Sequence, residues 1–220
     1  MPAKGDGFVS KYINRPVSNQ LTKFIIHFWP NCNPNIISII SAFFGIIGSI
    51  FFIVSIPLLG GIFIQLSSII DGSDGEVARA NGRTSFFGGF FDSVMDRYVD
   101  VLIFVSLTIF SLRVFFIIYA FLLGIITITG AYLISYTAAK VEAREDINFP
   151  RTIQGRDTRL FIVFLAGICA IFTDWAIPIC LLLISILTHV SVIFRINQIR
   201  KNKTQINYNY LFFFNAQNRL

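Results

Sequence analysis

The chain has 220 residues, of which 55% are hydrophobic and only 14% are charged, and its net charge is +6. A water-soluble domain carries about 25% charged residues, so this composition excludes a soluble globular protein and predicts an integral membrane protein. In a membrane protein the positions of the charges matter more than the net charge. We expect no nucleic-acid partner.

An amphipathic segment lies near the N-terminus. Apolar residues recur at helical spacing from Leu21 to Trp29, which gives one apolar face on a helix too short to cross a bilayer. Ser18 is placed to cap the N-terminus of this helix. We expect residues 1–35 to form a cytosolic segment whose helix lies flat on the membrane interface; an ordinary packed helix is the alternative.

Six apolar stretches follow, and about 20 residues are needed to cross a bilayer. Asn81 and Gly82 mark the second turn between them, and Thr84 or Ser85 is placed to cap the next helix. The sequence predicts an all-α integral membrane fold with six transmembrane helices over 36–197 and a cytosolic tail over 198–220. The expected spans are 36–56, 59–80, 86–111, 114–137, 159–174 and 176–196.

The basic residues set the expected orientation. Of the 18 Lys and Arg residues, only Arg113 falls in a turn on one side of the six spans, and the others lie on the opposite side or near it. Basic loop residues stay on the cytosolic side. We therefore expect a multi-pass protein of the cell (plasma) membrane, with both termini and the active site facing the cytosol.

The stretch 71–96 holds five acids between two apolar runs. The turn near Gly82 makes its two helical halves antiparallel. Asp74 and Asp92 then lie about 10 Å from the turn, and Asp71 and Asp96 about 15–17 Å from it. Spacings of three and four residues put each pair on one helix face. We expect the four carboxylates to converge on one small volume.

Four converging carboxylates in a membrane need cations, because an intramembrane acid costs about 2.5 kcal/mol or more. Salt bridges are one alternative, but Arg79, Arg83 and Arg97 are too few to balance these acids. Oxygen ligands of this kind suit Mg²⁺ or Mn²⁺, and two ions about 3.5–4 Å apart serve phosphoryl chemistry. We predict two such ions per site; a cation transporter, with acids nearer mid-membrane, is the distant alternative.

The spacing of these residues resembles the signature of the CDP-alcohol phosphotransferase (CDP-alcohol phosphatidyltransferase) family. The resemblance implies that Asp71, Asp74 and Asp92 bind two metal ions, and that Asp96 is the general base as well as a metal contact. It also implies a site for the cytidine diphosphate portion of the donor, formed by Asn35, Ser38, Asp71, Asp74, Gly75, Ala78, Arg79 and Gly88. The matching pattern is Asp71-x2-Asp74-Gly75-x2-Ala78-Arg79-x8-Gly88-x3-Asp92-x3-Asp96.

Outside the signature, INRP at 13–16 and GRDTRLF at 155–161 are most similar to the subgroup that contains di-myo-inositol-phosphate-phosphate synthase. This likeness implies transfer from CDP-inositol to inositol 1-phosphate with release of CMP. The alternative is a phospholipid synthase that uses CDP-diacylglycerol or CDP-archaeol with inositol phosphate or glycerol phosphate. In that subgroup a cytidylyltransferase domain often comes first; we expect none before residue 1, which leaves the source of CDP-inositol open.

An anionic acceptor needs cations beside the metal centre. Headgroup contacts are the alternative for every basic residue here, but a helix start favours anion binding at Arg156 and Arg159. The family resemblance also implies a homodimer. The candidates for the acceptor phosphate are Lys140, Arg144, Arg156 and Arg159, at the cytosolic ends of the fourth and fifth spans.

Overall fold

The computed structural model describes the backbone of residues 7–142 and 155–217 and the side chains of 7–141 and 155–200. Within these ranges every regular element is helical, which confirms the all-α prediction. A π-helical turn, η1 (Ser10–Asn14), leads into α1 (Arg15–Phe28). The remaining helices are α2 (Pro34–Ile53), α3 (Pro57–Ala80), α4 (Phe86–Ser111), α5 (Ile117–Glu142), α6 (Arg156–Cys169) and α7 (Ala176–Gln217).

Local signals set several of these boundaries. Asn33 caps α2, since its side chain accepts a hydrogen bond from the backbone N–H of Asn35 at 3.1 Å. Ser85, one of the two predicted caps, accepts one from the N–H of Gly88 at 3.0 Å and starts α4 at the predicted residue. Gly82 has a φ of 62° in the turn between α3 and α4, a conformation that favours glycine.

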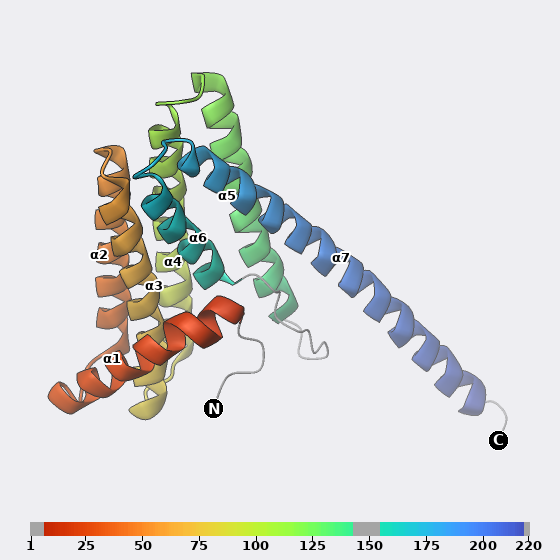
Figure 1. Cartoon of the computed structure of the whole chain (residues 1–220). Coiled ribbons are helices and arrows are strands. Elements are labelled where there is room, and N and C mark those ends of the chain that lie inside the picture. The colour runs from red at the N-terminus through yellow and green to blue at the C-terminus, as the bar shows by residue number, and fades with distance from the viewer. Residues whose placement is uncertain (1–6, 143–154, 218–220) are drawn as a thin grey trace.

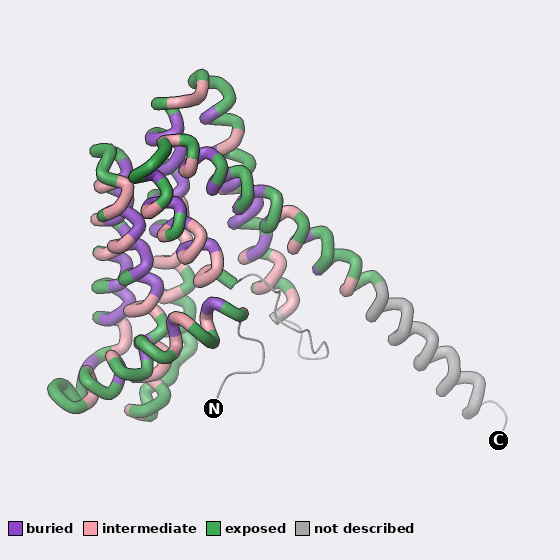
Figure 2. The backbone as a smooth tube through the Cα atoms, viewed as in Figure 1, coloured by how far each residue is buried: buried purple, intermediate pink, exposed green. Residues whose placement is uncertain are grey.

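The helices form a bundle around one main apolar core (Figure 1). Helix α3 packs against α1, α2 and α6, whereas α5 packs against α4 and α7. Phe52, Ile64 and Leu107 are fully buried between the helices. Large apolar side chains such as Ile39 and Phe43 lie exposed on the outer face of α2, and the exposed class covers much of the bundle surface in Figure 2. Such a surface is matched to lipid rather than to water.

Among the described residues, three helical stretches are long and apolar enough to cross a membrane: Pro34–Ile53, Ile117–Val141 and Ala176–Arg200. Helices α3 and α4 are long enough but carry the acidic residues, and α6 has only 14 residues. The chain is thus an integral membrane protein. The count of six spans stays a prediction.

The predicted cap of the N-terminal helix is wrong. The chain is already helical before Ser18, because η1 runs directly into α1 and Asn14 has helical backbone angles. The Ser18 side chain is buried and donates a hydrogen bond at 3.3 Å to Oε1 of Glu76 on α3. Thr22 donates to the other oxygen of the same carboxylate at 2.8 Å. These contacts attach α1 to α3.

The last helix is longer than predicted. The apolar pattern ends at 196, whereas α7 continues to Gln217 as one helix of 42 residues. The segment 197–217 contains no glycine or proline, so no helix-breaking residue interrupts it. In Figure 1 this part of α7 extends away from the bundle.

Close contact between α3 and α6 depends on glycine. A Cβ atom added at Gly167 would lie 2.6 Å from the carbonyl oxygen of Pro57, and one added at Gly61 would lie 3.0 Å from that of Phe164. Both neighbours are backbone atoms, which cannot move aside cheaply. The contact holds α6, which begins at Arg156, beside the acidic part of α3.

We expect Gly167→Ala to lower the free energy of unfolding by about 1–3 kcal/mol, because the added methyl overpacks the contact with α3. Thermal unfolding in detergent measures this change. Gly89→Ala on α4 is the matched control, since a Cβ there meets no atom within 4 Å. The control should be neutral or stabilising by up to about 1 kcal/mol. Equal destabilisation of the two variants would contradict the role assigned to Gly167.

Candidate active site

Three carboxylates from two helices meet at one point. One oxygen from each of Asp71 and Asp74 on α3 and Asp92 on α4 lies within 4.8 Å of the other two. The i+3 spacing places the first two on one face of α3, and the turn at Gly82 folds α4 back against them. We call these three residues the acidic triad.

The triad has the donor set of a divalent metal site. Ser41 Oγ donates to Asp71 Oδ1 at 3.3 Å, and Ser38 Oγ donates to Asp74 Oδ2, so α2 supplies neutral hydroxyls but no cation to these two. Among the described side chains, Oδ1 of Asp92 is buried and has no hydrogen-bond partner. A buried carboxylate oxygen normally has a partner. Clustered oxygen ligands with an unsatisfied member fit Mg²⁺ or Mn²⁺.

Asp96 joins this group through an arginine. Nη1 of Arg156 lies 2.6 Å from Asp96 Oδ1 and 2.9 Å from Asp71 Oδ2, so one guanidinium bridges the two carboxylates. The Arg156 side chain is only 11% exposed. The structure therefore brings Asp96 to the edge of the triad, with a cation from α6 between them.

Asp100 extends the network and was not among the predicted site residues. Its Oδ1 accepts a hydrogen bond from Nε of Arg156 at 3.1 Å, and its Oδ2 accepts one from Nη2 of Arg159 at 3.0 Å. Both Asp100 and Arg159 are only 2% exposed. The signal in the sequence is the repeat Asp92, Asp96, Asp100, in which each acid lies four residues after the last on one helix face.

The basic residues predicted for the acceptor phosphate separate into different environments. Arg156 and Arg159 lie in the buried network with the acids. Lys140 is exposed near the end of α5, with its Nζ 5.8 Å from the centre of the Tyr136 ring. Arg144 lies outside the described residues.

The residues predicted for the cytidine diphosphate portion gather around the same ends of α2, α3 and α4. A Cβ at Gly88 would lie 3.4 Å from Oδ1 of Asn35, and one at Gly75 would lie 3.2 Å from Nη1 of Arg79. Ala78 lies on α3 between Gly75 and Arg79. A side chain at either glycine would thus press on a polar neighbour, and binding of the donor at these residues stays a prediction.

An all-helical membrane bundle with a partly buried cluster of carboxylates is the architecture of an integral membrane protein with an acidic site. The model of one family, CDP-alcohol phosphatidyltransferase, matches residues 31–196. The chain belongs to this family, which confirms the resemblance drawn from the signature.

Relatives of known name agree with this placement. The bifunctional IPC transferase and DIPP synthase of Thermococcus kodakarensis is 33% identical over 189 residues, which cover 79% of this chain and 42% of the relative. The archaetidylinositol phosphate synthase of Pyrococcus horikoshii is 29% identical over 168 residues, which cover 76% of this chain and 84% of the relative. The chain spans less than half the length of the bifunctional relatives it matches.

The fold is also found in solved structures. The crystal structure of phosphatidylinositol phosphate synthase from Mycobacterium tuberculosis with CDP-DAG bound has a TM-score of 0.66 and 21% identity, covering 83% of this chain and 92% of that chain. The structure of the same enzyme with manganese and citrate has a TM-score of 0.67 and 20% identity, covering 82% and 87%. At this identity the likeness shows the fold.

Proposed function

We propose that the chain is a divalent-metal-dependent CDP-alcohol phosphotransferase. It transfers a substituted phosphate group from a CDP-alcohol to an acceptor alcohol and releases CMP. The observation that carries this proposal is the acidic triad, three carboxylates within 4.8 Å of one another in a chain of this family. Such a site suits phosphoryl transfer because the reaction depends on positioning and on stabilising charge.

The residues of the site divide the chemistry between them. In this proposal Asp71, Asp74 and Asp92 would hold two Mg²⁺ or Mn²⁺ ions, with Asp96 as a further metal contact, and such ions offset the negative charge of the pyrophosphate when bound. Asp96 takes the proton of the acceptor hydroxyl while the oxygen of that hydroxyl attacks the β-phosphorus of the donor. The new O–P bond forms while the bond from that phosphorus to the bridging oxygen breaks, and the oxygen leaves with CMP. Arg156 orients the Asp96 carboxylate for this transfer.

We propose CDP-inositol as the donor and inositol 1-phosphate as the acceptor. The relatives named DIPP synthase support this pair. A lipid donor, such as CDP-diacylglycerol or CDP-archaeol, is the second candidate, and it is favoured by the coverage of the archaetidylinositol phosphate synthase. The residues proposed to meet the acceptor phosphate are Lys140, Arg144, Arg156 and Arg159, of which Arg156 and Arg159 also pair with Asp100.

The proposed topology has six spans, α2 to α7, within a membrane domain over 36–197. The segments 1–35 and 198–220, with the active site, then face the cytosol. An ion pair between Arg113 and Asp174 at 3.0 Å joins the α4–α5 and α6–α7 turns, and supports placing these two turns on the same side. The family's usual homodimer is part of the same proposal.

The test offers the purified full chain CDP-inositol or CDP-diacylglycerol, each with inositol 1-phosphate and Mg²⁺ or Mn²⁺. We expect CMP release with one of the donors, because the triad needs a divalent ion to hold the pyrophosphate. Chelation with EDTA should abolish release, and added Mn²⁺ should restore it. If neither donor yields CMP while the chain in liposomes carries Mn²⁺ across the bilayer, the transporter alternative replaces the transferase.

A further inference from the structure

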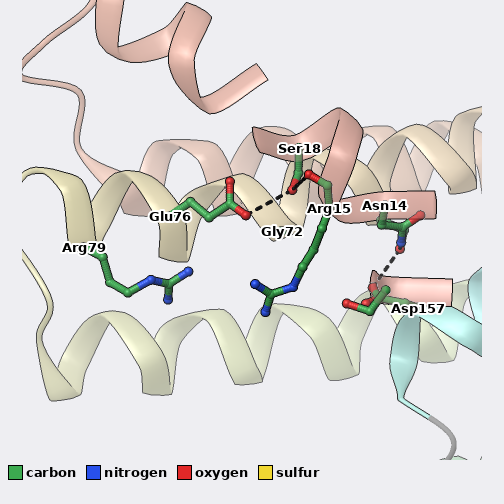
Figure 3. A pocket seen from close by; sticks show the side chains of 9 residues that line it. Asn14, Arg15, Ser18, Gly72, Glu76, Arg79 and Asp157 are labelled. Atoms are coloured by element: carbon green, nitrogen blue, oxygen red, sulfur yellow. Dashed lines mark hydrogen bonds between the residues drawn. The ribbon is translucent and has the colours of Figure 1, made fainter. Parts of the chain in front are cut away.

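A pocket outside the acidic triad lies between the N-terminal helix, α3 and α6. Its space is about 310 Å³, open solvent at its mouth included, and each described side chain that lines it is polar or is the hydrogen of a glycine. Figure 3 shows the side chains of Arg15 and Arg79 extending so that their guanidinium groups point toward one another. Arg15 comes from α1, and Arg79 from the last turn of α3.

The charges of the described residues that line this pocket balance. Arg15 and Arg79 contribute two positive charges, and Glu76 and Asp157 contribute two negative ones. Glu76 accepts hydrogen bonds from Ser18 and Thr22, and Asp157 accepts one from Ser68 at 3.0 Å, so the two carboxylates are held in place. A lining of guanidinium donors and carboxylate and hydroxyl acceptors suits a neutral molecule with many hydroxyl groups. An alkyl chain needs an apolar lining, and a phosphate dianion needs a net positive one.

The pocket adjoins the proposed catalytic site. Gly72, in its lining, directly follows Asp71 of the triad on α3. Asp157 directly follows Arg156, whose guanidinium bridges Asp71 and Asp96. Arg79 belongs to the signature residues expected around the donor. The pocket therefore lies one residue along the chain from a triad carboxylate on α3 and from the bridging arginine on α6.

We propose that this pocket binds the alcohol half of the CDP-alcohol donor, and that this alcohol is a polyol, with Arg15 donating hydrogen bonds to its hydroxyl groups. The negative charge of such a donor lies in its pyrophosphate, so its alcohol half is neutral and matches the balanced lining. The inference rests on the proposed function and deepens it, because it selects a polyol over a lipid as the donor's alcohol.

A binding experiment on the full chain in detergent with Mn²⁺ tests this inference. Dissociation constants are measured for CDP-inositol and for CDP, which lacks the alcohol. Arg15→Gln should weaken CDP-inositol binding by about tenfold or more, since a hydrogen bond from a charged group is lost, and leave CDP binding unchanged. Lys23→Gln is the matched control, because it removes the same charge from an exposed position of α1. It should change neither constant.

Equal affinities of the wild type for CDP-inositol and CDP would overturn the inference, as would an Arg15→Gln variant that binds CDP-inositol normally. If Arg15→Gln weakens the binding of inositol 1-phosphate but not of CDP-inositol, the pocket belongs to the acceptor, and this too would overturn the inference. If Arg15→Gln does not fold, Arg15→Lys carries the test with an intermediate loss expected. Release of CMP by the wild type is measured separately, so failure of the reaction and failure of the pocket are distinguishable.

Discussion

Asp96→Asn should lower the rate of CMP release by about 100-fold or more, the usual contribution of a general base, while Mn²⁺ binding stays close to that of the wild type. Asparagine keeps the size of the side chain but cannot take the proton of the acceptor hydroxyl. The triad oxygens within 4.8 Å of one another come from Asp71, Asp74 and Asp92, so the main ligand group stays intact. Single-turnover CMP release and a Mn²⁺ titration measure the two effects.

Asp92→Asn is the comparison for this experiment, because it makes the same change one helical turn earlier on α4. It removes a triad carboxylate and should weaken Mn²⁺ binding about tenfold or more, as loss of a charged ligand does. The two variants are thus expected to separate metal binding from proton transfer. A loss of Mn²⁺ affinity in Asp96→Asn as large as in Asp92→Asn would rule out a separate role for Asp96 as base.

Asp100→Asn should destabilise the fold by about 3–5 kcal/mol, because it leaves the buried Arg159 without its carboxylate partner. Asp100 lies 3.0 Å from Nη2 of Arg159 and 3.1 Å from Nε of Arg156, and its side chain is 3% exposed. Unfolding of the purified chain in mixed micelles measures the loss. The rate of CMP release should fall as well, because Asp100 helps to hold the Arg156 guanidinium against Asp96.

Asp174→Asn provides the control for Asp100. It breaks the ion pair with Arg113, whose side chains are 47% and 37% exposed. Pairs exposed to this degree contribute about 0–1 kcal/mol, so the control should keep nearly the full stability of the wild type. If Asp100→Asn lowers the free energy of unfolding as little as Asp174→Asn does, the burial of Arg156 and Arg159 does not depend on their ion pairs with Asp100.

Features governed by neighbours in the sequence could be predicted from it. The cap at Ser85 and the start of α4 follow from a serine before an apolar helical run. The convergence of Asp71, Asp74 and Asp92 follows from helical spacing and one turn. The start of α1 could not be found in this way, because Ser18 has the composition of a cap but is used in a contact with Glu76 on α3.

The sequence predicts Arg156 and Arg159 beside the metal centre as partners of an acceptor phosphate, but their ion pairs with Asp96 and Asp100 could not be predicted, because α6 lies far from α4 in the sequence. The local sequence offers Arg79, Arg83 and Arg97, and counting these alone leaves the acids unbalanced. Helix packing instead brings Arg156 and Arg159 from α6 into contact with α4. That contact depends on the close approach of α6 to α3, which Gly61 and Gly167 permit. The hydrophobic periodicity of the sequence does not indicate which helices pack together.

The shortness of α6 has a consequence for how charge is tolerated in this bundle. A helix of 14 residues extends about 21 Å, whereas the hydrocarbon layer is about 30 Å thick. In the proposed six-span topology, with the Cys169 end of α6 at one membrane surface, its Arg156 end would lie about 9 Å short of the other. In that topology we expect hydrophilic reactants to reach the carboxylates beside Arg156 from the aqueous side, without crossing the hydrocarbon layer.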